Sequence, residues 1–352
     1  MTNTALLHGV GWVLLAGIMW GSVFIVPAIL HDYPPAILSI SRYLAFGLIS
    51  LPLALAGRRE IARLSRADWR EAARLSLVGN LLYYGFLAAA IQLAGPPLPT
   101  MIIGALPVVI AIASNAGEQA LPWRRLALSL AVIAAGILLV NRDELAQVEA
   151  AGDSRLLAGA SAALVALACW TWYPIRNATW LRKRPGLRPD VWATAQGLTT
   201  LPLALAGWLA FGGLASLGGP ETADGFGRAW SDGSDAAAGE RFDAAASGAS
   251  DAAAGAAFDW PLGPRPALFV SLMLAIGLLA SWLGTLCWNR ASQLLPTSLA
   301  GQLIVFETLS ALAMGFAWRG QWPAPGTWAG VALLVAGVVL GVRAFRPRAA
   351  AD

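Results

Sequence analysis

Leu51-Pro52-Leu53-Ala54-Leu55-Ala56-Gly57 recurs letter for letter at Leu201 to Gly207, 150 residues further along the chain. Trp20 and Trp170 keep the same offset, and Ala90-Ile91-Gln92-Leu93 resembles Ala291-Ser292-Gln293-Leu294 at an offset of 201. The difference between the two offsets, 51 residues, predicts extra length between the matched segments, and a loop at 214–265 supplies it. Matches that agree on one register indicate an internal duplication.

Both copies lie in a chain that is too apolar for a soluble protein. Hydrophobic residues make up 57% of the 352 residues and charged residues 12%, and the mean hydropathy is +0.63. The charged share is about half that of soluble domains, so polar side chains could not cover a 36.7 kDa globule. The two cysteines, Cys169 and Cys287, lie in apolar runs, which excludes a disulfide scaffold. The composition predicts an integral membrane protein.

Ten apolar stretches are long enough to cross a bilayer, which takes about 20 helical residues. They are residues 11–30, 36–57, 73–94, 98–117, 124–141, 157–177, 191–213, 267–289, 298–318 and 327–345. The first lacks the basic start of a signal peptide, so we expect it to be retained as a helix. The predicted fold class is an all-α polytopic membrane protein with ten transmembrane helices in two five-helix repeats.

An odd number of helices per repeat sets the topology. The second repeat must enter the membrane upside down, which is the inverted-repeat architecture of secondary transporters, whose site lies near the midplane between the repeats. With a cytoplasmic N-terminus, 16 of the 24 Lys and Arg residues fall in inner loops and six in outer loops, while Arg42 and Arg176 lie within helices. This distribution predicts that both termini are cytoplasmic.

The repeats divide the chain into segments. We expect a first repeat at 1–141, a periplasmic linker at 142–156, a second repeat at 157–345 and a cytoplasmic tail at 346–352. The 214–265 loop of the second repeat is of low complexity and lies in the periplasm, with an aspartate every eight residues from Asp235 to Asp259 in Ala- and Gly-rich sequence. Calcium-binding Gly-Gly-x-Gly-x-Asp repeats are absent, so this composition predicts an extended acidic spacer.

Several motifs resemble the EamA domain of the drug/metabolite transporter superfamily. They are the Trp-Gly opening within Leu15–Ser22, Pro34-Pro35 followed by Ser41-Arg42-Tyr43, Gly104–Val108 and Gly330–Val338. Cys169–Tyr173, Trp192–Gln196, Gly263–Pro266 and Ile304–Leu309 are more similar to the YtfF-type inner-membrane branch. The resemblance covers nearly the whole chain as two EamA copies. It implies a multi-pass protein of the bacterial inner membrane that exports or exchanges small metabolites.

Ionisable side chains inside a bilayer are costly and are therefore candidates for function. Glu307 lies about ten residues into its predicted helix, near mid-membrane, as a proton, cation or basic-substrate site or as a structural carboxylate paired with an arginine. Arg42 either binds a substrate carboxylate or braces its helix against Glu307. Arg176 lies near a cytoplasmic helix end, where its side chain can reach water.

Aromatic and amide side chains within the spans form the second candidate set. A mid-span indole needs a partner for its N–H, which a polar cavity provides, although core packing is the alternative for each. In the third helix, Asn80 and Tyr84 share a face at i and i+4. The candidate substrate-binding residues are Trp20, Arg42, Asn80, Tyr83, Tyr84, Trp170, Trp172, Tyr173, Trp282, Trp288, Gln302 and Glu307, and Glu307 is also the candidate for proton or ion coupling.

The predicted function is secondary transport of a small organic metabolite by alternating access, with a cavity between the repeats. The alternative is a non-transporting membrane scaffold or stress-related protein. The two histidines and two cysteines form no catalytic or metal-binding motif, so no enzyme, cofactor or metal site is expected. The expected partners are a small-molecule substrate and the lipid bilayer, without nucleic acid. Gly17–Gly21 and Gly337–Gly341 fit Gly-x-x-x-Gly, which brings helices close within one chain or in a homodimer.

Deleting residues 225–257 should leave expression and membrane insertion near wild type. Loop-closure entropy changes by only about 0.6 kcal/mol for each doubling of loop length, so a spacer without packed contacts is dispensable. The measurement is the yield of monodisperse protein from membranes, compared with a deletion of 191–213, which removes a predicted span and should abolish insertion. Loss of yield in the 225–257 deletion would show that the spacer packs against the helices.

Overall fold

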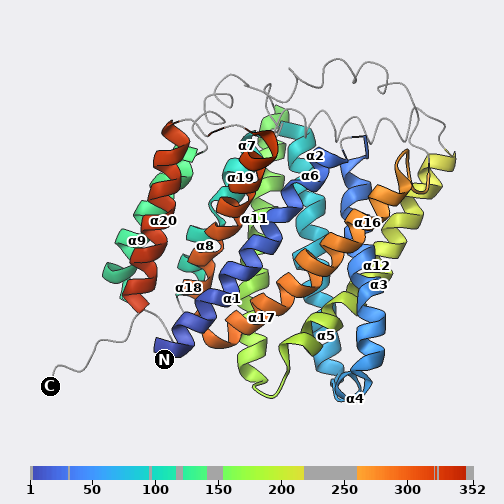
Figure 1. Ribbon diagram of the computed structural model, residues 1–352, viewed down its shortest axis with the longest axis horizontal. Coiled ribbons are helices and arrows are strands. Elements are labelled where there is room, and N and C mark those ends of the chain that lie inside the picture. The colour runs from blue at the N-terminus through green and yellow to red at the C-terminus, as the bar shows by residue number, and fades with distance from the viewer. Residues whose placement is uncertain are drawn as a thin grey trace.

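The computed structural model is all-helical (Figure 1), and it describes residues 3–30, 32–94, 97–115, 122–140, 154–217, 260–320, 322 and 325–345. The helices run side by side, and α1 (Asn3–Gly21) begins at the same end of the bundle at which α20 (Pro325–Phe345) ends. The expected tail at 346–352, most of the 142–156 linker and the eight-residue aspartate repeat lie outside the described residues.

Helices cover each of the ten apolar stretches. The first half holds α1, η1 (Ser22–Phe24), α2 (Val26–Ile29), α3 (Pro35–Ala56), α4 (Arg58–Ile61), α5 (Arg66–Ser76), η2 (Leu77–Leu82), α6 (Tyr83–Ala94), α7 (Pro97–Gly104), α8 (Leu106–Ser114) and α9 (Trp123–Val140). The second half holds α11 (Ser154–Lys183), α12 (Pro189–Leu217), α16 (Pro266–Ile276), η3 (Gly277–Leu283), α17 (Gly284–Leu294), α18 (Thr297–Leu303), α19 (Val305–Arg319) and α20. The prediction of an all-helical chain is confirmed.

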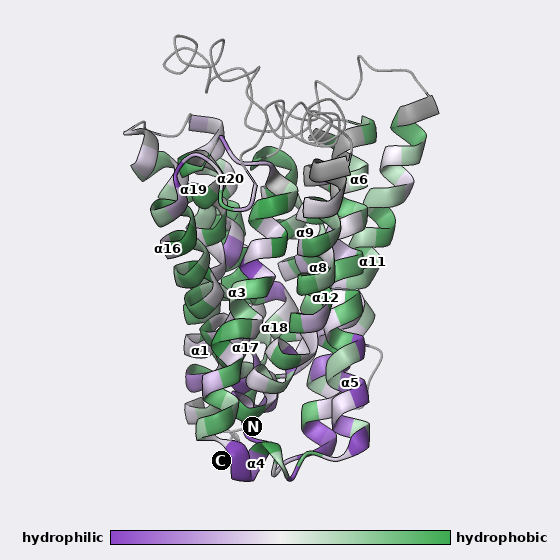
Figure 2. Cartoon of the chain, turned by 90° about the vertical axis from the view of Figure 1, so that its right-hand side faces the viewer, coloured by the Kyte–Doolittle hydropathy of each residue, from purple (hydrophilic) through white to green (hydrophobic). Residues whose placement is uncertain are grey.

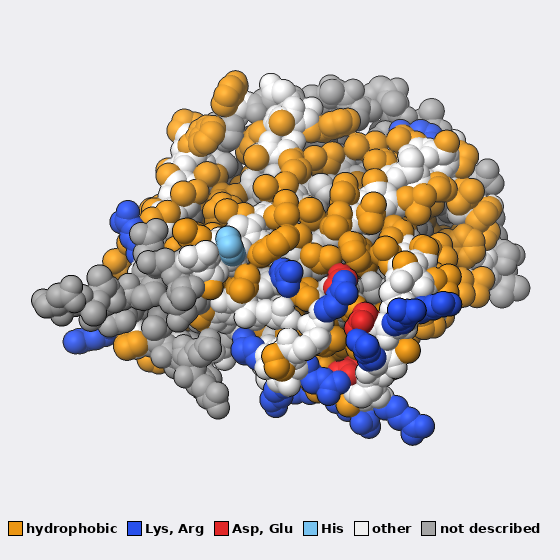
Figure 3. Space-filling model, turned by 60° about the horizontal axis from the view of Figure 1, so that its bottom comes forward, with side chains coloured by type: hydrophobic (Ala, Val, Ile, Leu, Met, Phe, Trp, Pro, Cys, Tyr) orange, Lys and Arg blue, Asp and Glu red, His pale blue; other side chains and the backbone are white. Residues whose placement is uncertain are grey.

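The surface is that of a membrane protein. Six segments in the described part of the chain are long and apolar enough to cross a bilayer: Thr4–Gly21, Ala36–Ala56, Leu156–Lys183, Pro266–Leu294, Thr297–Trp318 and Pro325–Phe345. Hydrophobic residues occur along the length of the bundle, and hydrophilic residues gather at the end that carries α4 and α5 (Figure 2). Lys and Arg side chains are concentrated on that same end (Figure 3).

Helix contacts follow the internal duplication. α1 of the first half packs against α17 and η3 of the second half. α11, which is equivalent to α1, packs against α6 and η2 of the first half. α3 also packs against α12 and α9 against α20, each a pair of equivalent helices, and α8 packs against α18 of the equivalent span. α1 makes a further large contact with α19. Both Gly-x-x-x-Gly motifs pack within the chain, because Gly17 and Gly21 face α19 and Gly337 faces Ile133 of α9.

The two π-helical segments, η2 and η3, occupy equivalent places in the duplication. Adding the offset of 201 to Leu77–Leu82 gives residues 278–283, and η3 covers Gly277–Leu283. The i→i+5 bonding of a π-helix inserts a residue into the α-helical register and is frequent at functional sites. Each repeat therefore carries the same local irregularity in its third helix.

Ion pairs between α5 and α11 were missed from the sequence. Arg176, expected to reach water, is 37% exposed and also donates to both carboxylate oxygens of Glu71, which is buried. One turn earlier on α5, Asp68 accepts hydrogen bonds from Ser65 and Trp180 and pairs with Arg184. A buried carboxylate needs such partners, so these pairs fix α5 against the end of α11.

The acidic loop is shorter than 214–265. α12 continues to Leu217, and residues 260–265 pack on the helices. Trp260 lies 4.3 Å from Trp208 between ring centroids, the Tyr33 hydroxyl donates to the Leu262 carbonyl at 2.9 Å, and Arg265 pairs with Asp32. Residues 260–265 therefore make specific contacts with the helices, whereas the sequence analysis placed them at the end of the extended acidic spacer.

Candidate functional site

Three tryptophans and two tyrosines meet at the centre of the helix bundle. The Trp20 ring lies 6.0 Å from Trp170 and 5.6 Å from Trp288 between centroids. Trp170 also lies 5.7 Å from Tyr83 and 5.1 Å from Tyr173, edge to face in both cases. These distances favour aromatic contacts. We name these five residues, which come from α1, α6, α11 and α17, the aromatic cluster.

The π-helical segments hold the aromatic cluster in place. The Trp20 indole N–H donates to the Ala280 carbonyl of η3 at 2.9 Å. In η2, Gly79 lies at the position equivalent to Ala280 and faces the Tyr173 ring, to which an added Cβ would come within 2.3 Å. The Tyr173 hydroxyl donates to Gln196 Oε1 on α12 at 2.8 Å. Both irregular segments thus contact a ring of the cluster from the opposite half of the chain.

A charged group adjoins the aromatic cluster. Arg42 Nε donates to Ser281 Oγ of η3 at 3.1 Å, and the guanidinium lies 5.4 Å from the Tyr43 ring centroid. Glu307 is half-buried, and its carboxylate makes no hydrogen bond or ion pair with the described residues, although its backbone N–H donates to the Ile304 carbonyl at 2.9 Å. A Cβ at Gly17 of α1 would lie 3.1 Å from the Glu307 backbone nitrogen, and Trp20, one turn further along α1, bonds to Ala280 beside Ser281. Arg42 and Glu307 therefore meet segments that pack on the same stretch of α1. No ion pair braces Arg42 against Glu307, which favours the other interpretation of Arg42.

Glu307 follows a break between two helices. α18 ends at Leu303 and α19 begins at Val305, so Glu307 lies in the first turn of α19, where the helix dipole stabilises a carboxylate. Gly17 of α1 allows this approach, because a Cβ there would lie 3.1 Å from the Glu307 backbone nitrogen. Broken helices near the midplane are typical of transporter binding sites.

Eight of the twelve predicted residues come together in this region: Trp20, Arg42, Tyr83, Tyr84, Trp170, Tyr173, Trp288 and Glu307. Tyr84 joins through a side-chain hydrogen bond with Ser39 of α3, one turn before Tyr43. The structure therefore unites the aromatic and charged candidates that the sequence kept separate.

The other four candidates lie elsewhere. Trp172 is 37% exposed on the outside of α11, because two residues turn a helix by about 200° from Trp170. Asn80 donates to Thr200 Oγ1 at 3.3 Å, and Trp282 donates to Thr194 Oγ1 at 3.0 Å. Gln302 is fully buried and accepts from Ser129 Oγ at 2.7 Å, so it joins α18 to α9.

Tyr43, Ser281 and Gln196 are site residues that sequence reasoning missed. Tyr43 follows Arg42 directly, and Ser281 is equivalent to Asn80 at the 201 offset, so the duplication carried a signal for both. The Gln196 side chain is buried. Its Oε1 accepts a hydrogen bond from Tyr173, and its Nε2 has no partner among the described residues. No group of three His, Cys, Asp or Glu side chains that could hold a metal ion occurs in the described segments.

Fold and site together define a helical membrane protein built by duplication around a polar and aromatic centre. The model of the EamA-like transporter family matches residues 7–142 and 253–343, and the chain belongs to that family. This confirms the resemblance seen in the sequence.

One relative agrees with this assignment, and one solved structure shares the fold. The chain is 44% identical over 344 residues to inner membrane protein YtfF of Escherichia coli (strain K12), with 96% of each covered. A solved crystal structure matches with a TM-score of 0.66 at 16% identity over 97% of this chain and 96% of that chain. The second likeness supports the fold.

Substituting Gly79→Ala should lower the melting temperature of the purified protein by several degrees. The new methyl group meets the Tyr173 ring at 2.3 Å, and overpacking costs about 1–3 kcal/mol. Gly85→Ala is the matched control, because nothing lies within 4 Å of its Cβ and alanine favours a helix by about 0.5–1 kcal/mol. Thermal unfolding in detergent should therefore shift in opposite directions, and equal shifts would contradict the close contact at η2.

Proposed function

We propose that this protein is a secondary transporter that exports or exchanges a small organic metabolite by alternating access. The observation that carries the proposal is the pair Arg42 and Glu307, two charged side chains without an ion pair between them, on or against segments that pack around α1 beside Trp20 of the aromatic cluster. A substrate anion would bind Arg42, a cationic group or a proton would bind Glu307, and an apolar part would rest on the aromatic rings. Membership of the EamA-like transporter family supports transport.

The proposed topology has ten crossings in two inverted five-helix repeats, with both termini in the cytoplasm of a bacterial cell. The exchange of contacts between equivalent helices supports the repeat, and the Lys- and Arg-rich end with α4 and α5 supports the orientation. The inner-membrane relative supports the location. A homodimer in the membrane stays a prediction.

Alternating access requires one repeat to rock against the other around the site. We propose η2 and η3 as the flexing points, since π-helical turns are strained relative to α-helix and both contact the aromatic cluster. The single bond from Arg42 to Ser281 would break and reform as η3 moves.

A non-transporting scaffold or stress-related protein is the second candidate, and a direct assay separates the two. Purified protein in proteoliposomes should take up or release members of a radiolabelled metabolite panel above the rate of empty liposomes. No transport across a panel of acids, bases and zwitterions by folded protein would favour the scaffold.

Single cysteines in a background without Cys169 and Cys287 test the topology. Labelling with a membrane-impermeant maleimide should reach position 66 only from the cytoplasm, and positions 150 and 240 only from the periplasm. Labelling of position 240 from the cytoplasm would contradict the inverted repeat, because it would require an even number of crossings in one repeat.

Glu307→Gln should reduce transport about tenfold or more and remove its dependence on an imposed pH gradient, while leaving the fold intact. Losing one charged hydrogen bond to a ligand costs about 1.5–3 kcal/mol, and glutamine keeps the shape without the titration. Glu60→Gln serves as the control, since the half-buried Glu60 pairs with the exposed Arg63 outside the site. Normal rates and a normal pH profile in Glu307→Gln would remove Glu307 from the site.

A further inference from the structure

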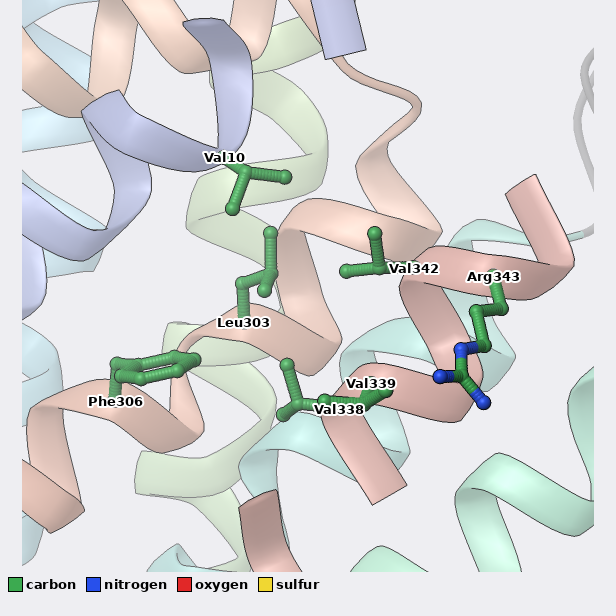
Figure 4. A pocket seen from close by; sticks show the side chains of 7 residues that line it. All are labelled: Val10, Leu303, Phe306, Val338, Val339, Val342 and Arg343. Atoms are coloured by element: carbon green, nitrogen blue, oxygen red, sulfur yellow. The ribbon is translucent and has the colours of Figure 1, made fainter. Parts of the chain in front are cut away.

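An apolar groove opens on the membrane side of the bundle, away from the aromatic cluster. It lies between α1, the α18–α19 break and α20, and has a volume of about 290 Å³ (Figure 4). Val10, Leu303, Phe306, Val338, Val339 and Val342 line it together with Arg343. Leu303 and Val338 are buried and form its floor, whereas Val339 is 42% exposed at its mouth.

Arg343 is the one charged member of this lining and has no carboxylate partner. It forms no ion pair or hydrogen bond with any described residue, in contrast to Arg176, Arg184 and Arg265, each of which pairs with an acidic side chain. Arg343 lies in the last turn of α20, at the end of the bundle where α1 begins. Arg343 is exposed, so its guanidinium is free to pair with an anion from outside the chain.

We propose that the groove binds one phospholipid with an acidic headgroup. An acyl chain fills the valine-lined part, since water there would find no hydrogen-bond partners, and the lipid phosphate pairs with Arg343. Basic residues beside grooves between transmembrane helices on the cytoplasmic side recognise acidic lipids in this way. The lipid would come from the inner leaflet under the proposed topology.

The bound lipid would touch the moving part of the transporter. Phe306 lines the groove and directly precedes Glu307, and Leu303 is the last residue of α18. An acyl chain in the groove therefore lies against the break that carries Glu307. Lipid occupancy would bias the position of α19 relative to α1.

Native mass spectrometry of the full chain, titrated with phosphatidylglycerol and with phosphatidylcholine, tests the proposal. Wild type should retain one phosphatidylglycerol more strongly than phosphatidylcholine. Arg343→Gln should lower the phosphatidylglycerol affinity about fivefold, the effect of one charge near a membrane surface. Val339→Phe should fill the mouth of the groove and lower the affinity for both lipids.

Matched controls make the outcome decisive. Arg290→Gln removes an exposed arginine outside the groove, and Val335→Phe changes a valine one turn away on α20 that is 41% exposed and does not line the groove. Both should bind as wild type. Equal retention of the two lipids by wild type, or unchanged lipid binding in Arg343→Gln and Val339→Phe, would overturn the proposal. A dimer mass lost in these variants without a change in lipid would assign the groove to a second copy of the chain. Lipid binding is read without transport, so its failure leaves the proposed function standing.

Discussion

The hydrogen bond from Trp20 to the Ala280 carbonyl determines how the two halves of the chain meet. Inside a bilayer every backbone polar group must find a partner within the protein, and a π-helical segment displaces carbonyls from the regular helical ladder. Trp20 supplies the partner from the opposite half while its ring packs on Trp170 and Trp288. Gly284 keeps the space open, since a Cβ there would lie 2.6 Å from the indole nitrogen. The irregular helix, the aromatic cluster and the close contact of α1 with α17 therefore depend on one another.

The scaffold is duplicated, but its charges are not. Trp20 and Trp170 are equivalent, as are Gly79 and Ala280, and each repeat has a π-helical segment and a broken helix. Arg42 has Trp192 as its equivalent at the 150 offset, and Glu307 has Leu106 at the 201 offset. Duplication alone would have produced two copies of each charge or none. The charged group is thus the place where the two halves have diverged, which separates the residues that shape the bundle from those that would bind a ligand.

Hydrophobic length was enough to predict the apolar helices, because an apolar run of about 20 residues leaves few alternatives to a helix. It missed the polar helices α4 and most of α5, which lie between the stretches 36–57 and 73–94. It did not give the side of the helix that faces the centre. Trp170 and Trp172 were both predicted to bind substrate, yet a helix turns about 100° per residue and separates them. Asn80 and Tyr84 were expected on one face, but η2 inserts a residue into the register, so Asn80 contacts α12 while Tyr84 bonds to Ser39 of α3. Neither π-helical segment has a signature in composition or periodicity. The partners of Glu71 and Gln302 depend on which helices become neighbours, which a single span does not specify.

The centre also indicates why a purely structural role fits this protein poorly. A guanidinium has five N–H donors, and Arg42 uses one of them on Ser281 within the described chain. The Glu307 carboxylate accepts no hydrogen bond there. In hydrocarbon, unsatisfied charges cost several kcal/mol, so a scaffold would gain stability from pairing these two side chains or from replacing them with apolar residues. Their separation is stable only if water or a ligand occupies the space around them. Such a centre is hydrated or filled by a ligand, and single hydrogen bonds join the two halves there. The proposed alternating access requires both features.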